Sequence, residues 1–302
     1  MLRTWVRLLA LLALPVGLAA NAQTLYAVSV RTYSDPGYKG VEGNLYTIDL
    51  HDSSVRLQSS LHVGNAPVGL DGIAIHPGTG AFYGITAPNS RMIPQSLVSV
   101  DPKTGDVALI GKLGHAGSDI VFDEDGTLYI WLADTKQLGT VDVETGLATP
   151  RGKPLVQEAA AKGGLALIGK GRALIAATGG TGTLDTVNLA TGAVTTGPQL
   201  VGAPFPELMS GLAYSADGVL YGINKNFGGT ARADLVIINP QTGKVSSITP
   251  LPDDTDALAF GPALPQAQDS TSLFRRWRTP ILIALGVLAL GFIVWAAASR
   301  KA

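Results

Sequence analysis

Short apolar runs alternate with polar turns along most of this chain. The segment 97–131 shows the pattern most clearly, because its apolar runs are separated by the turn-like sequences 101–105 and 123–126 and by a Gly-containing link. Runs this short, bounded by Asp, Asn, Gly and Pro, are typical of β-strands, whereas an amphipathic helix needs a longer periodic stretch. The pattern predicts an all-β protein.

The apolar runs fall into a repeating unit of four, named A to D here, and each kind occurs five times. The A runs begin at residues 72, 118, 164, 211 and 257, the B runs at 25, 82, 128, 174 and 220, the C runs centre on 46, 98, 139, 185 and 236, and the D runs begin near 55, 107, 148, 194 and 245. The second B position carries Tyr26, Tyr83, Tyr129, Ile175 and Tyr221. A period in the forties with four short strands is the signature of propeller blades.

The connections between the C and D runs support this interpretation. They read DPKTG at 101–105, DVETG at 142–146, NLATG at 188–192 and NPQTG at 239–243. An Asp or Asn side chain can accept hydrogen bonds from the next backbone amides, and Gly can take the left-handed conformation that closes a hairpin. The sequence DEDG at 123–126 resembles the start of a calcium loop, but its counterparts at 169–171 and 215–218 are plain turns. We therefore interpret it as a turn.

The order of the runs predicts how the ring closes. The repeat region begins with a B run and ends with an A run at 257–260. The first blade is complete only if this last run joins the first three strands, which leaves no free sheet edge between first and last blades. The sequence thus predicts a five-bladed β-propeller of four-stranded blades over residues 23–262, closed by one C-terminal and three N-terminal strands.

The repeated sequence motifs resemble those of exported bacterial propellers of the NHL, YVTN and quinoprotein-like superfamily. These motifs are LYGI, LV-x-I-D-P-x-T-G and GLA-x-x-x-DG-x-LY. The resemblance covers nearly the whole repeat region, and it implies a propeller fold without implying one activity. Quinoprotein repeats that use the cofactor carry a docking Trp after the T-G turn. No Trp follows Gly105, Gly146, Gly192 or Gly243, so no quinone is expected.

Both ends of the chain are apolar. Residues 1–22 read as a secretory signal peptide, with Arg3 and Arg7 before an apolar stretch and a small-x-small cleavage site at 20–22. Residues 280–298 carry no charge and match the length of a transmembrane helix. A linker with a basic juxtamembrane segment at 263–279 precedes this helix, and a short tail at 299–302 follows it. We expect the propeller on the extracytoplasmic side, periplasmic or extracellular, and the tail in the cytoplasm.

Charge and cysteine content exclude several classes of function. The formal net charge is −1, with 22 Lys and Arg against 23 Asp and Glu, so the chain lacks the basic excess of a nucleic-acid binder. No cysteine is present, which excludes disulfides, Cys-ligated metals and Cys nucleophiles. We expect no nucleic-acid partner.

The starts of the A runs bring candidate site residues together. Asp71, Asp119, Gly163, Ser210 and Asp256 stand at or just before them. Three carboxylates near one axis repel one another unless a hard cation or shared protons compensate, so Asp71, Asp119 and Asp256 are candidate ligands for a divalent metal such as Ca²⁺ or for a sugar. Alternatively, each Asp accepts hydrogen bonds from the amides of neighbouring blades and repeats with the fold.

The D–A and B–C connections lie on the same face as these residues. They carry aromatic and charged side chains that suit recognition of a protein, peptide or glycan, or that simply anchor the loops. These side chains are Tyr33, Tyr38, Arg91, Phe205, Glu207, Phe227 and Arg232. His115 precedes the second A run and is a further candidate for the channel. The histidines show no metal-binding spacing.

Two functions from different classes fit these observations. The first is a membrane-anchored binding or scaffold propeller, because the chain has no nucleophile elbow, P-loop or dinucleotide fingerprint. The second is a propeller-type hydrolase or lyase acting on a glycan or lactone. In that case Asp71, Asp119 and Asp256 would serve as base or metal ligands, and Glu207 as the acid.

Overall fold

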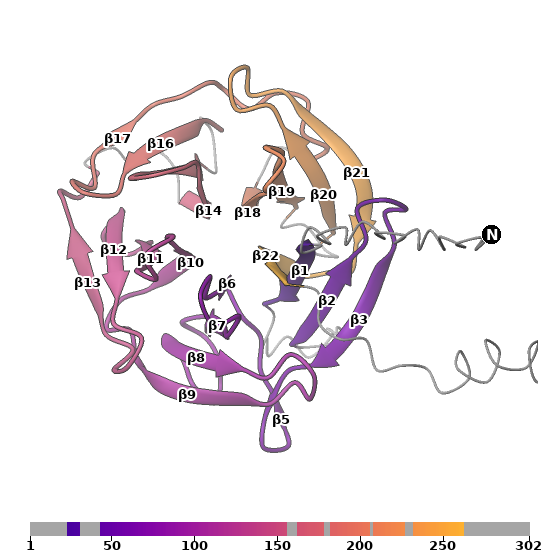
Figure 1. Ribbon diagram of the computed structural model, residues 1–302, viewed down its shortest axis with the longest axis vertical. Helices are drawn as coiled ribbons and strands as arrows, with labels where there is room; N and C mark the ends of the chain where they lie inside the picture. The colour runs from indigo at the N-terminus through magenta and orange to yellow at the C-terminus, as the bar shows by residue number, and fades with distance from the viewer. Residues whose placement is uncertain are drawn as a thin grey trace, which may run out of the picture. The chain divides into compact units, whose positions relative to one another are not determined.

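The computed structural model describes residues 23–30, 43–155, 162–177, 182–205, 208–226 and 232–262. Within these ranges the protein is all-β, and five four-stranded antiparallel sheets surround a central axis (Figure 1). The predicted five-bladed propeller is therefore confirmed. The signal peptide, the linker, the transmembrane helix and the tail predicted from the sequence all lie outside the described residues.

Each blade runs from an inner to an outer strand in the order A to D. Blade I contains β22 (Thr255–Pro262), β1 (Gln23–Ser29), β2 (Asn44–Ile48) and β3 (Val55–Ser60); blade II contains β6 (Gly72–Ile75), β7 (Phe82–Ile85), β8 (Ser96–Val100) and β9 (Val107–Lys112); blade III contains β10 (Gly117–Phe122), β11 (Leu128–Leu132), β12 (Gln137–Val141) and β13 (Ala148–Arg151). Blade IV contains β14 (Lys162–Leu167), β15 (Arg172–Ala177), β16 (Leu184–Asn188) and β17 (Val194–Thr195), and blade V contains β18 (Leu208–Tyr214), β19 (Leu220–Lys225), β20 (Ala233–Ile238) and β21 (Val245–Leu251). A small hairpin of β4 (His62–Val63) and β5 (Ala66–Pro67) joins blades I and II.

Blade I combines the two ends of the repeat region. Strand β22 pairs antiparallel with β1, and Leu258 faces Ala27 across the ladder. The last strand before residue 263 thus supplies the inner strand of the first blade. This pairing gives the first blade its fourth strand and closes the ring, because it joins the two ends of the repeat region in one sheet.

The C–D turns have the chemistry expected from the sequence and also contact the preceding blade. In blade II, Asp101 Oδ1 accepts a hydrogen bond from the Lys103 amide at 2.8 Å, and Gly105 has a φ of 84°. The Gly105 carbonyl accepts a hydrogen bond from the His62 amide at 2.9 Å. The turn of one blade is therefore fixed to the connection that leaves its neighbour.

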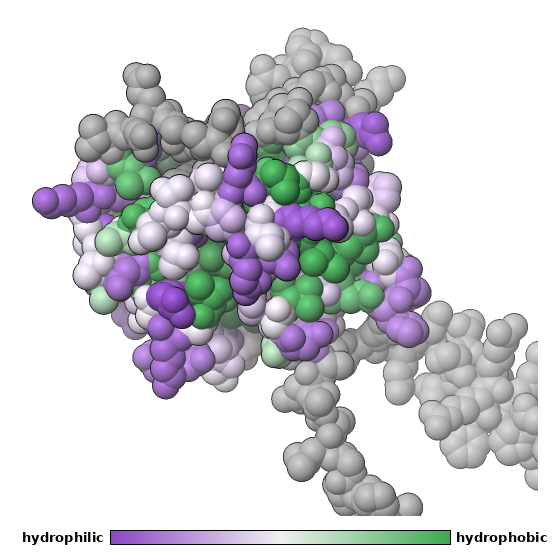
Figure 2. All heavy atoms as spheres, turned by 90° about the horizontal axis from the view of Figure 1, so that it is seen from above, coloured by the Kyte–Doolittle hydropathy of each residue, from purple (hydrophilic) through white to green (hydrophobic). Residues whose placement is uncertain are grey.

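The core lies between the blades. One apolar cluster packs blade II against blade III and includes Ile85, Leu97, Ile120 and Ile130. At the junction of blades I and II, the rings of Tyr26 and Phe82 meet edge to face with centroids 4.9 Å apart. Outside this core, polar residues are interspersed with apolar ones on the surface seen in Figure 2. Apolar burial between adjacent blades therefore holds the five sheets in place.

Candidate functional site

The strand registers identify which residues are equivalent at the start of the inner strands. Ile73, Ile120, Leu165, Leu212 and Leu258 face Gly84, Ile130, Ile175, Gly222 and Ala27 of their B strands, respectively. The residues two positions earlier are Asp71, Ser118, Gly163, Ser210 and Asp256, and we call these five the inner ring. The inner strands that carry or follow them surround the axis in Figure 1.

The predicted equivalence of Asp119 with Asp71 and Asp256 is wrong by one residue. Asp119 pairs with Trp131 as Gly72 pairs with Ile85, so Asp119 stands one residue beyond the inner-ring position, which Ser118 occupies in blade III. A one-residue difference also affects the B strands. Leu174 pairs with Ala166 as Tyr129 pairs with Val121, so Leu174, not Ile175, is equivalent to Tyr129. A sequence alignment that assumes equal spacing cannot locate such single-residue irregularities.

Asp119 binds the backbone of two blades. Its Oδ1 accepts a hydrogen bond from the Ile120 amide at 2.9 Å, and its Oδ2 accepts one from the Leu165 amide of blade IV at 2.8 Å. The residue is 1% exposed. Burial raises the pKa of the Asp119 carboxyl, and the amide hydrogen bonds oppose that rise. This arrangement matches the alternative interpretation in which the carboxylate joins neighbouring blades.

Lys225 and Asp256 form a buried ion pair across the junction of blades V and I. Lys225 Nζ lies 2.5 Å from Asp256 Oδ1, and the two side chains are 6% and 13% exposed. Lys225 ends strand β19, and Asp256 belongs to β22. From the sequence we expect a bound cation or shared protons to offset the repulsion between the carboxylates. At Asp256 the Lys225 ammonium group supplies this positive charge.

Asp71 lies in the electrostatic field of this pair. Burial raises the pKa of the Asp71 carboxyl well above its usual range, the negative charge of Asp256 raises it further, and Lys225 opposes the rise. The backbone amide of Asp71 donates to the Ile85 carbonyl at 2.8 Å, which fixes the start of the strand. Asp71 is thus a carboxyl group with a raised pKa next to the Lys225–Asp256 ion pair.

Two hydroxyl groups of the inner ring have no hydrogen-bond partner in the described part of the chain. Ser118 Oγ and Ser210 Oγ are both buried, and Ser210 as a whole is 5% exposed. A buried hydroxyl without a partner costs roughly 1–3 kcal/mol. A molecule that binds at the inner ring could therefore recover hydrogen bonds that the protein alone does not make.

The outer part of this face carries further polar contacts. Arg232 Cζ lies 5.7 Å from the centroid of the Phe205 ring, so these two sequence candidates do meet. His115 Nδ1 lies 3.0 Å from Asp134 Oδ2. Arg91 is exposed. The candidates Tyr33, Tyr38, Glu207 and Phe227 lie outside the described residues.

The residues of the described ranges contain no group of three or more His, Cys, Asp or Glu side chains that could hold a metal ion. Asp256 is paired with Lys225, and Asp119 accepts hydrogen bonds from backbone amides, so these two carboxylates already have partners within the described residues. The same part of the chain has no helix that is long and apolar enough to cross a bilayer.

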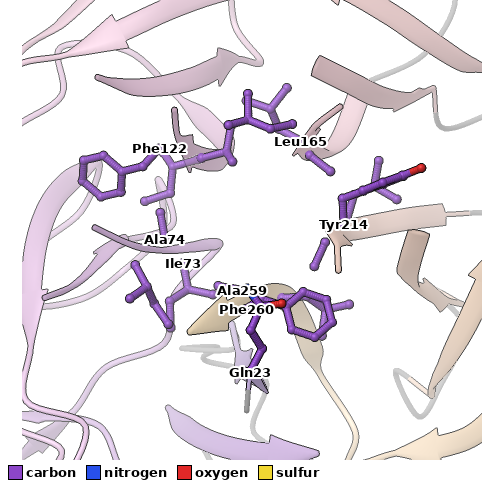
Figure 3. A pocket seen from close by; sticks show the side chains of 16 residues that line it. Gln23, Ile73, Ala74, Phe122, Leu165, Tyr214, Ala259 and Phe260 are labelled. Carbon is purple, nitrogen blue, oxygen red and sulfur yellow. The ribbon is translucent and has the colours of Figure 1, made fainter. Parts of the chain in front are cut away.

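The opposite half of the central channel contains a cavity of about 200 Å³. It is bounded by all five inner strands and by Gln23, and Figure 3 shows Phe122, Tyr214 and Phe260 around it. Gln23 Oε1 accepts a hydrogen bond from the Ala216 amide at 3.1 Å. The cavity is mostly lined by aliphatic and aromatic residues, so the chemistry of the site is concentrated at the inner ring.

Lys225 and Ser118 are the functional candidates that the sequence analysis missed. The sequence did contain a signal for Lys225. The position equivalent to Lys225 is apolar in blades I to III, where it is Val30, Ala87 and Ala133. A single charged residue at a position that is otherwise apolar indicates a special contact. Ser118 gave no such signal, because only the strand register distinguishes its position from that of Asp119.

No family model matches the sequence, and no curated protein matches it. Among solved structures, the chain is similar to one in the crystal structure of a nidogen–laminin complex, with a TM-score of 0.51, 9% identity, and coverage of 80% of this chain and 98% of that one. It is also similar to a gluconolactonase from Xanthomonas campestris, with a TM-score of 0.48, 12% identity and coverage of 73% of each chain.

A protein of unknown function from Bacteroides thetaiotaomicron gives a TM-score of 0.45 at 13% identity. That match covers 59% of this chain and spans only 50% of the other. At these identities the likeness to the nidogen–laminin chain shows the fold alone. That likeness agrees with the propeller fold of the described residues.

Proposed function

We propose that this protein is a binding propeller that takes up a ligand at the inner ring. The observation that carries the proposal is the buried pair of Lys225 and Asp256, with Asp71 in its field, at the start of the inner strands. Buried charges cost free energy unless they are paired, and strongly shifted carboxyl groups cluster at functional sites. A purely structural propeller could place small apolar residues at these positions.

We further propose that the propeller works on the extracytoplasmic side of a membrane. The supporting evidence is in the sequence, which predicts a signal peptide at 1–22 and a single transmembrane helix at 280–298. The face that carries the inner ring would then be open to ligands outside the cytoplasm. Phe205 and Arg232 at its edge offer an aromatic ring and a cation of the kind that contacts a protein, a peptide or a glycan.

A thermal-shift screen of the purified full chain against sugars, amino acids, peptides and metal ions tests the binding function. We expect at least one class of ligand to raise the Tm, because a ligand that binds only the folded state stabilises it. Asp71→Asn should abolish that rise. Asp217→Asn, in an exposed turn on the other face, should leave it unchanged. An equal response in the two variants would contradict the proposal.

A hydrolase or lyase is the second candidate, and the pKa of Asp71 favours it. A carboxyl whose pKa is raised well above its usual range, beside a second carboxyl group, is the arrangement of a general acid with a second charged group. Glu207, the acid predicted from the sequence, lies outside the described residues, so we assign the acid role to Asp71. Turnover of a lactone or glycoside that is lost in Asp71→Asn and kept in Asp217→Asn would establish this function in place of simple binding.

A further inference from the structure

We propose that the ligand of the inner ring is a small neutral molecule rich in hydroxyl groups, such as a polyol or a monosaccharide. This inference rests on the proposed function, and it specifies the ligand class of the same site. Three features of the site carry it: the balance of its charges, its unpaired hydroxyl groups and the mixture of donors and acceptors that it offers.

The first feature is charge balance. Lys225 is already paired with Asp256 at 2.5 Å, and both side chains are largely buried. An anionic ligand would approach the carboxyl groups of Asp256 and Asp71, and a cationic ligand would compete with Lys225 for Asp256. The anion would be repelled by these carboxyl groups or would compete with Asp256 for Lys225, and the cation would leave Lys225 without its partner. Both outcomes are strongly unfavourable. A neutral ligand leaves the pair intact.

The second feature is the pair of unpartnered hydroxyl groups. Ser118 Oγ and Ser210 Oγ are buried and accept or donate no hydrogen bond within the described residues. The two serines belong to blades III and V, and Gly163 of blade IV stands between them in the ring. A Cβ at Gly163 would lie 3.2 Å from Ser210 Cα, so the backbones of blades IV and V are in close contact here. The bare glycine adds no side chain between the two serines.

The third feature is the kind of hydrogen bond on offer. The Lys225 ammonium only donates and the ionised Asp256 carboxylate only accepts, whereas serine hydroxyls do both. A raised pKa lets the Asp71 carboxyl act as a donor as well. A ligand hydroxyl also donates and accepts, so several hydroxyls on one small frame can satisfy this mixture without carrying charge.

Calorimetric titration of the full chain with probes of different charge tests the ligand class. The neutral probes are myo-inositol and D-glucose, the anion is D-gluconate and the cation is putrescine. We expect heat from at least one neutral probe and none from the charged ones. If D-gluconate or putrescine binds instead, and Asp71→Asn abolishes that binding, the inner ring is a ligand site but the neutral class is wrong. If none of the four binds, the inference is also overturned, and the broader screen decides the binding function by itself.

A serine pair tests the role of the unpartnered hydroxyls. Ser210→Ala should weaken binding of the neutral probe by about tenfold, the loss of one hydrogen bond, while the Tm of the free protein stays equal or rises. Ser90→Ala is the matched control, because Ser90 is also 5% exposed with an unpartnered hydroxyl but lies in the B–C connection of blade II. Equal affinity in both variants would overturn the assignment of Ser210 to the ligand.

Discussion

Lys225 Nζ of blade V lies 2.5 Å from Asp256 Oδ1 of blade I, at the junction where the C-terminal strand β22 completes the ring. The ion pair thus links blade V to blade I, whereas the ladder between β22 and β1 holds blade I together. The same pair contributes to the electrostatic environment of Asp71. The link between the last and first blades and the electrostatics of the candidate site therefore share two side chains.

Replacing Lys225 with Met should destabilise the protein by on the order of 3 kcal/mol, because it leaves Asp256 buried without its counter-ion. Urea unfolding measures the change. The double variant Lys225→Met, Asp256→Leu should recover most of the loss, since it removes both charges. A double variant as unstable as the sum of the two single variants would show that the pair has no coupling.

Asp71→Asn should change how stability depends on pH. The folded-state pKa of Asp71 is raised, so the folded state holds this proton more tightly than the unfolded state. The stabilisation is complete below the ordinary Asp pKa of about 4, and it is lost as pH rises through the raised pKa. The Asn variant should therefore lose less stability between acid and neutral pH. Urea midpoints of both proteins across this range give the comparison, and parallel curves would contradict the raised pKa.

Asp119→Ala should destabilise the fold without changing ligand affinity. The substitution removes the acceptor of the Leu165 and Ile120 amides, and each buried amide left unpaired costs roughly 1–3 kcal/mol. We expect a loss on the order of 3 kcal/mol in chemical unfolding. Asp125→Ala, in an exposed turn of the same blade, is the control. A drop in affinity out of proportion to the loss of folded protein would contradict this prediction and would show that Asp119 contributes to binding.

Alanine substitutions at two turn glycines distinguish the cost of backbone strain from the cost of a lost contact between blades. Gly105 and Gly218 have φ values of 84° and 86°, so an Ala at either position costs about 1 kcal/mol of strain. A Cβ at Gly105 would also collide with the Ser60 carbonyl of blade I, whereas nothing lies within 4 Å of a Cβ at Gly218. Gly105→Ala should therefore lower the Tm more than Gly218→Ala. Equal losses would show that the turn does not depend on its contact with blade I.

The fold could be predicted from the sequence because its determinants are local and repeated. A turn such as 101–105 can be recognised from its Asp at the first position and its Gly at the last. The hydrogen bond to Asp101 Oδ1 and the positive φ of Gly105 agree with this prediction. The number of blades followed from counting strands. The register at Asp119 could not be predicted, because the A–B hairpin of blade III is one residue shorter than that of blade II and the apolar pattern does not reveal the difference.

The site was less accessible to sequence reasoning than the fold. Asp71 and Asp256 were found because they occupy one repeat position. Their partner Lys225 comes from the end of a different strand in the neighbouring blade, and no spacing rule within one repeat connects it to Asp256. Contacts between blades depend on the geometry of the ring, which the repeat pattern does not specify.

The most direct test of the account is a crystal structure of the full chain grown with the neutral ligand that titrates best. The account predicts density for this ligand at the inner ring, with its hydroxyl groups within hydrogen-bond distance of Ser118 Oγ and Ser210 Oγ and with the Lys225–Asp256 pair intact. Ligand density elsewhere on the propeller, with both serine hydroxyls bonded to protein groups, would contradict it.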